Sequence, residues 1–105
     1  MEEILLREGR RREEIFKNLP EYLKKLKAFL KKLDKNCMVF IFGSVVKNEY
    51  ALISDIDILI LTKLEPAELI AKLRENGFNE PFEFHVVDEK RFKFYKYFVQ
   101  ELKEI

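Results

Sequence analysis

The sequence predicts a small α/β (α+β) domain in which a mixed β-sheet is packed with helices. Two short, almost wholly apolar runs at residues 38–42 and 56–62, and an alternating run at 82–87, are typical of strands. Segments with apolar residues at helical spacing flank and separate these runs. The chain has 105 residues, with no repeat or low-complexity linker. We therefore expect a single domain spanning residues 1–105.

The first third of the chain predicts N-terminal helices within residues 1–35. A first helix is expected over residues 1–17, weakened in its middle by Gly9. Pro20 is well tolerated in a first helical turn, so a second helix begins near Asn18. Apolar residues at helical spacing continue it to about Lys35: Tyr22, Leu23, Leu26, Phe29, Leu30 and Leu33.

The remaining elements follow from punctuating residues. Gly43 stops the first strand, and Pro66 opens a helix expected over residues 67–76. Gly77 is typical of the position after a helix end. Asp88 can cap a last helix over about 88–103, whose apolar residues at helical spacing are Phe92, Tyr95, Val99 and Leu102.

Connection lengths predict which strand ends meet. The second and third strands are joined through a helix, so they are expected to be parallel neighbours. The short connection at 44–53 lets the first strand run antiparallel to the second. The end of the first strand, at Gly43, then lies beside the beginnings of the other two, which carry Asp57 and Glu83.

The acidic residues at this edge predict a metal site. Asp55 and Asp57 are two positions apart, so they are expected on one face of the strand, about 7 Å from each other. Burying a carboxylate costs roughly several kcal/mol of folding free energy unless a cation, proton or metal neutralises it. Carboxylate oxygens prefer Mg²⁺, and two such ions can activate an attacking oxygen and stabilise a leaving one in phosphoryl transfer.

The ordered motifs Gly43-Ser44, Ser54-Asp55-Ile56-Asp57 and Phe82-Glu83-Phe84 resemble those of the DNA polymerase β-type nucleotidyltransferase superfamily. The chain is most similar to its small minimal nucleotidyltransferases, and the resemblance covers the motif core at about 38–87. It implies Mg²⁺-dependent transfer of a nucleoside monophosphate, AMP from ATP, to a hydroxyl acceptor with release of pyrophosphate. It also implies that Asp55 and Asp57 bind the ions. Glu83 would be the third acid, which activates the attacking hydroxyl or helps to bind metal.

The resemblance further implies a nucleotide-binding turn. Gly43 and Ser44 would hold the triphosphate through backbone N–H groups and a hydroxyl, where the dipole of a following short helix favours a phosphate. Lys47 and Ser54 are the other predicted nucleotide-binding residues. Beyond Glu83, His85 shares its strand face and could contact a nucleotide or acceptor, although a structural role is the expectation.

Two departures from the family pattern favour a different class of function. The family often has Arg directly after Gly-Ser and Gly three positions later, where this chain has Val45 and Asn48. Minimal nucleotidyltransferases often pair with a HEPN-domain protein in toxin–antitoxin systems. The alternative is therefore an antitoxin-type binding module with weak or lost catalysis. A metal-dependent nuclease is a third possibility, because Mg²⁺ held by acids also cleaves phosphodiesters.

Composition limits the other classes. Lys and Arg number 20 against 19 Asp and Glu, so the chain lacks the basic excess of a general nucleic-acid binder, and nucleic acid is expected only as an acceptor. No apolar stretch approaches the roughly 20 residues of a membrane span. The single cysteine, Cys37, fits a reducing cytoplasm. Aromatic residues at 92–98 favour core packing together with a surface for a homo-oligomer or partner.

Overall fold

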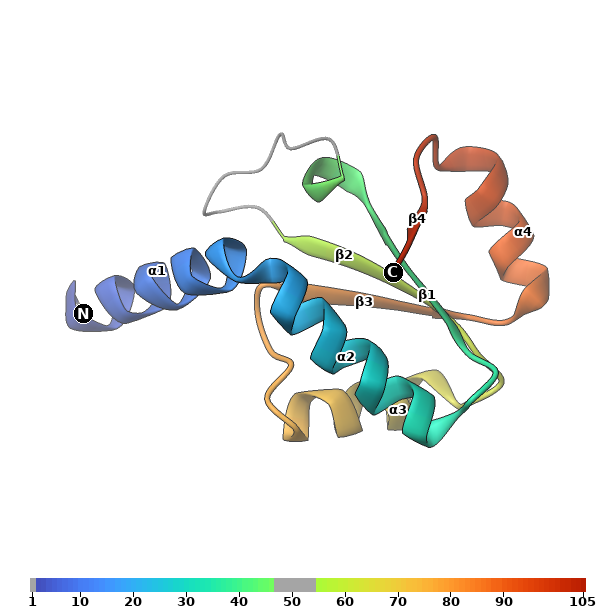
Figure 1. The fold of residues 1–105 in the computed structure, drawn as a ribbon, viewed down its shortest axis with the longest axis horizontal. Helices are drawn as coiled ribbons and strands as arrows, with labels where there is room; N and C mark the ends of the chain where they lie inside the picture. Colours follow the sequence, from blue (N-terminus) through green and yellow to red (C-terminus); the bar gives the residue numbers. More distant parts are fainter. Residues whose placement is uncertain (1, 47–54) are drawn as a thin grey trace.

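The computed structural model describes residues 2–46 and 55–105, without the side chains of 2–6 and 8. The helices of this part are α1 (Glu2–Lys17), α2 (Leu19–Leu33), α3 (Pro66–Glu75) and α4 (Glu89–Phe98) (Figure 1). The strands are β1 (Met38–Phe42), β2 (Ile56–Leu61), β3 (Phe82–Val87) and β4 (Lys103–Glu104), and a 3₁₀ turn, Gly43–Val45, follows β1. None of the described helices is long and apolar enough to cross a membrane.

The strands form one mixed sheet in the order β3-β2-β1-β4. β1 runs antiparallel to β2, and β2 runs parallel to β3, as the connection lengths predict. The parallel pair is joined through α3, which is a crossover connection. The predicted α+β class with a small mixed sheet is therefore confirmed.

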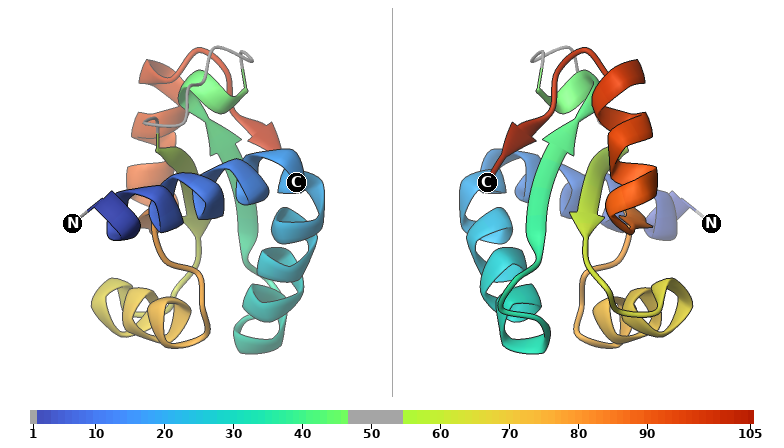
Figure 2. Two further views of the ribbon diagram at one scale, coloured as in Figure 1. Left: turned by 90° about the vertical axis from the view of Figure 1, so that its left-hand side faces the viewer. Right: turned by 90° about the vertical axis from the view of Figure 1, so that its right-hand side faces the viewer.

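Strand alternation divides the sheet into two faces with different coverings (Figure 2). On one face, Ile56, Ile58 and Ile60 of β2 are wholly buried in the main core. This core includes Leu26 and Leu30 of α2 and Leu69 and Leu73 of α3. On the other face, Phe40, Leu59 and Val87 pack with Phe92 and Tyr95 of α4. Asp57 and Glu83 belong to this second face, because Asp57 alternates with these isoleucines and Glu83 alternates with Phe82 and Phe84, which are also in the main core.

The last helix is shorter than the sequence predicts. The expected helix over about 88–103 ends at Phe98, and Val99 is extended. The chain then turns back and β4 pairs antiparallel with β1, through Phe40↔Glu104 and Ile41↔Lys103. This pairing gives backbone partners to the outer edge of β1, which would otherwise be unpaired. Leu102 packs on the same cluster as Phe92, but it lies between α4 and β4, so its helical spacing does not indicate a helix.

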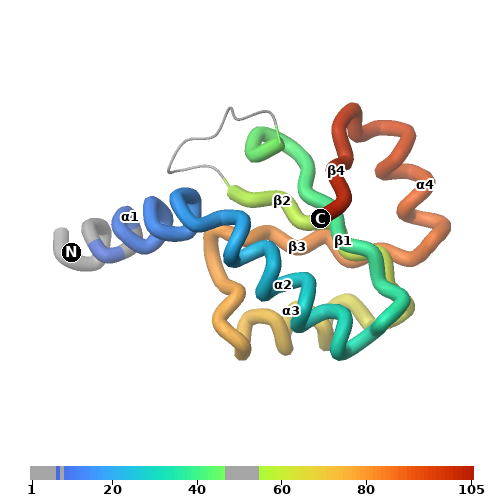
Figure 3. Tube along the Cα trace, viewed as in Figure 1, coloured from blue at the N-terminus to red at the C-terminus, as the bar shows by residue number. Residues whose placement is uncertain are grey.

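The first helix extends away from the body of the domain, as the tube in Figure 3 shows. Its C-terminal end is fixed by Ile15 and Phe16, which are buried in the main core. Arg12 also forms an ion pair with Glu80, which precedes β3. Among the described side chains of α1, those in the core therefore lie at this end.

Candidate active site

Strand register brings Asp57 and Glu83 side by side. Asp57 is the second residue of β2 and pairs with Glu83, the second residue of the parallel strand β3. On its other side Asp57 pairs with Phe42, the last residue of β1. The predicted meeting of the end of β1 with the beginnings of β2 and β3 is thus confirmed.

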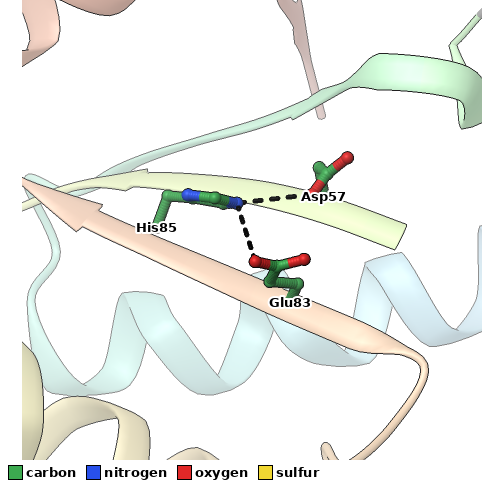
Figure 4. Close-up of side chains that lie close together, drawn as sticks. All are labelled: Asp57, Glu83 and His85. Atoms are coloured by element: carbon green, nitrogen blue, oxygen red, sulfur yellow. Dashed lines mark hydrogen bonds and ion pairs between the residues drawn. The ribbon is translucent and has the colours of Figure 1, made fainter. Parts of the chain in front are cut away.

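Three polar side chains converge at this edge: Asp57, Glu83 and His85 (Figure 4). One ligand atom from each lies within 4.8 Å of the other two. His85 Nε2 is 3.3 Å from Asp57 Oδ1 and 3.9 Å from Glu83 Oε1. Asp57 and His85 are each 26% exposed and Glu83 is 54% exposed. The cluster is therefore open to solvent and to a ligand.

His85, for which the sequence favours a structural role, lies within this cluster. The period of two placed it on the face of Glu83, which was the available signal, but not next to Asp57. That contact depends on the register of β3 against β2, which places His85 opposite Leu59, two residues beyond Asp57. The imidazole contacts Phe42 edge-on at a ring separation of 5.1 Å, and its Nδ1 lies 3.3 Å from the hydroxyl of Tyr95 in α4.

The electrostatics of this cluster favour a bound cation. Like charges directly opposite on neighbouring strands destabilise a sheet, and Asp57 and Glu83 are such a pair. Two carboxylates with an imidazole nitrogen are also an ordinary ligand set for a divalent metal ion. The residues present therefore fit the divalent ion that the sequence predicts.

Gly43, directly after the last residue of β1, lies beside the carboxylate of Asp57. Its φ of +80° is a conformation that L side chains rarely adopt. A Cβ at this position would also lie 2.6 Å from Asp57 Oδ2. Glycine is thus needed both for the turn and for its close approach to the carboxylate, so the Gly43-Ser44 turn does lie beside Asp57.

Of the helix expected after this turn, the described residues contain the three-residue 3₁₀ segment Gly43–Val45. Ser44, its middle residue, is partly exposed. A helix dipole depends on several aligned peptide units, so it contributes little here. Phosphate binding by Gly43 and Ser44 would consequently depend mainly on backbone N–H groups and the Ser44 hydroxyl.

Of the remaining predicted site residues, Asp55 lies in the described part of the chain. Asp55 immediately precedes β2 and is exposed. Among the described residues, the group of ligand atoms within 4.8 Å of one another contains Asp57, Glu83 and His85 without Asp55. Lys47 and Ser54, like Asn48, lie outside the described residues.

Comparison with known proteins decides the family. The model of the nucleotidyltransferase domain family matches residues 23–105, which include the whole sheet and the converging acids. The chain belongs to this family. No match was found among the curated proteins.

Solved structures agree with this nucleotidyltransferase fold. The crystal structure of a candidate nucleotidyltransferase is 29% identical, with a TM-score of 0.67, covering 80% of this chain and 97% of that one. A second candidate nucleotidyltransferase, from Sulfolobus solfataricus, is 19% identical with a TM-score of 0.53. It covers 92% of this chain and 85% of its own, and supports the fold alone.

The nucleotidyltransferase domain also has a groove of about 690 Å³ at the opposite ends of the strands, where β1 begins and β2 and β3 end. Asp34, Thr62 and Asp88 are among its lining residues, whereas Asp57, Glu83, His85 and the Gly43 turn are not. This volume does not make the groove the reaction site, because the clustered metal-ligating groups of the described residues lie at the other ends of the strands.

Proposed function

We propose that this domain transfers a nucleoside monophosphate, AMP from ATP, to a hydroxyl acceptor in a Mg²⁺-dependent reaction that releases pyrophosphate. The observation that carries the proposal is the contact of the Gly43 turn with Asp57, directly beside Glu83 in the sheet of a nucleotidyltransferase-family domain. A phosphate-holding turn and paired carboxylates are the groups that this reaction requires at one place.

Each residue has a proposed role. Asp55 and Asp57 hold the metal ions, and Glu83 either helps to hold them or accepts the proton of the attacking hydroxyl. Two divalent ions, when bound, supply charge neutralisation for the attacking and leaving oxygens. Gly43 leaves room for a phosphate near the carboxylates, and Ser44 donates a hydrogen bond to a phosphate oxygen. Lys47 and Ser54 are further proposed contacts of the nucleotide.

Titration calorimetry with Mg-ATP, together with an AMP-transfer assay, tests this function. Wild type should bind Mg-ATP, while Asp55→Asn and Asp57→Asn should bind it more weakly and lose transfer. Glu75→Gln is a matched control, because Glu75 is an exposed acid at the end of α3, on the opposite face of the sheet. Equal binding and equal activity in wild type and both aspartate variants would exclude the proposed metal-dependent transfer.

An antitoxin-type module that pairs with a HEPN-domain protein is the second candidate. It is favoured by a cluster of exposed aromatic residues in α4: Phe94, Tyr97 and Phe98 are 64%, 84% and 68% exposed. Phe94 stacks on Phe98, and Tyr97 contacts Phe98 edge-on, so the three form one surface. Exposed apolar surface of this kind marks an interaction site. The arginine that the family pattern has after Gly-Ser is replaced by Val45, which is buried.

Co-expression with a HEPN-domain protein encoded next to this chain tests the second candidate. A stable complex that is lost when Phe94, Tyr97 and Phe98 are replaced by serine would support it. The unpaired protein, analysed by light scattering, shows whether the same surface instead forms a homo-oligomer. A clean monomer that transfers AMP to small molecules and ignores the HEPN protein would count against pairing.

A further inference from the structure

His85 lies between the two carboxylates of the acidic cluster. Its Nε2 faces two carboxylates, at 3.3 Å from Asp57 and 3.9 Å from Glu83. An octahedral ion with bonds of about 2.1 Å separates its ligand atoms by about 3 to 4 Å. The two distances at His85 therefore match those between ligands that share one metal ion.

The other nitrogen of His85 also has a hydrogen-bonding partner. Nδ1 lies 3.3 Å from the hydroxyl oxygen of Tyr95. A tyrosine hydroxyl can accept a hydrogen bond as well as donate one, so Tyr95 can accept from Nδ1–H. In that tautomer the lone pair of His85 is on Nε2, directed at the two carboxylates, whereas in the other tautomer Nε2–H donates to Asp57. A hydrogen bond at the remote nitrogen commonly fixes the tautomer and orientation of a metal-bound imidazole.

Packing holds the imidazole in this orientation. Phe42 and Tyr95 both contact the ring, at centroid separations of 5.1 and 6.0 Å. Phe42 comes from β1 and Tyr95 from α4, so two elements besides β3 determine where Nε2 points.

We propose that His85 is a metal ligand through Nε2, and that Asp57, Glu83 and His85 together bind a transition-metal ion such as Mn²⁺ more tightly than Mg²⁺. The inference rests on the proposed function in one respect, that Asp57 and Glu83 hold a divalent ion. An imidazole nitrogen is a better ligand for transition metals than for Mg²⁺, which strongly prefers oxygen. The site then carries out its reaction with either ion but retains Mn²⁺ at lower concentration.

The chain contains one histidine, which makes a spectroscopic test unambiguous. Protein prepared without a histidine tag is loaded with Mn²⁺ in the absence of nucleotide. Electron spin echo modulation should then show coupling of Mn²⁺ to an imidazole nitrogen, which can come only from His85. Loaded wild-type protein without this coupling would overturn the proposal, and no variant is needed for that result.

Affinity measurements give a second, independent readout. His85→Ala should weaken Mn²⁺ binding by at least about 10-fold and leave Mg²⁺ binding nearly unchanged, and Tyr95→Phe should weaken Mn²⁺ binding by about 10-fold. Equal losses for both ions, or none for either, would contradict the proposal. These experiments contain no nucleotide. Absence of AMP transfer would therefore exclude the proposed function while leaving the histidine ligand intact.

Discussion

Replacement of Gly43 by alanine separates the local role of this glycine from its role in the site. The new Cβ would lie 2.6 Å from Asp57 Oδ2, closer than the 3.4 Å at which ordinary contacts begin. The carboxylate must therefore retreat by about 0.8 Å, from 2.6 Å to 3.4 Å. A displacement of about 1 Å in a reacting constellation can cost roughly 100-fold in rate. Gly43→Ala should accordingly weaken divalent-metal binding and reduce AMP transfer by up to about two orders of magnitude.

Gly77 provides the matched control. It has a φ of +90°, but a Cβ there would meet nothing within 4 Å. Both alanine variants should lose about 1–2 kcal/mol of stability, because a left-handed backbone is unfavourable for a residue with a Cβ. Only Gly43→Ala should also lose metal affinity and activity.

The assays are chemical denaturation for stability, calorimetry for metal binding and mass spectrometry for AMP transfer. Metal binding is measured at a temperature where both variants are fully folded. If Gly43→Ala binds metal and turns over as well as Gly77→Ala, the approach of Gly43 to Asp57 does not position the carboxylate, and the reasoning is refuted.

Three further predictions concern charges and the buried thiol. In metal-free protein at pH 8.5, Asp57→Asn and Glu83→Gln should each raise unfolding free energy by about 1 kcal/mol or less, because like charges repel across a short distance. The double variant should add little more, and fully additive or destabilising effects would contradict this repulsion. A hydrogen bond from Thr62 lowers the pKa of Asp34 below 3.8, so this contact stabilises the fold above pH 3.8 and is lost as the pH falls through the lowered pKa. Thr62→Val should therefore cost about 1 kcal/mol at pH 7 in thermal unfolding, with the gap to wild type narrowing in acid; a gap independent of pH would exclude this link. Burial raises the pKa of the Cys37 thiol, so a thiol reagent should react slowly with native protein and completely in guanidinium, and rapid native reaction would show that the thiol is accessible.

Much of the fold follows from local patterns in the sequence. The apolar runs, Pro66, Gly77 and the cap at Asp88 mark elements that the structure has at nearly the same residues. These signals are readable because each depends on backbone conformation or on periodicity within one segment. The end of the last helix could not be predicted from such local signals. Val99 and Leu102 have helical spacing, but pairing of β4 with the edge of β1 decides their conformation.

The meeting of Asp57, Glu83 and the Gly43 turn, where β1 ends and β2 and β3 begin, is predictable without the structure. Strand alternation and connection length are sufficient for that inference, because they restrict the directions in which neighbouring strands can run. Only the tertiary structure showed that His85 belongs with them. Its place depends on the register of two strands distant in sequence and on α4, which brings Tyr95 to its ring. Contacts of this kind are set by packing between elements, which no local pattern encodes.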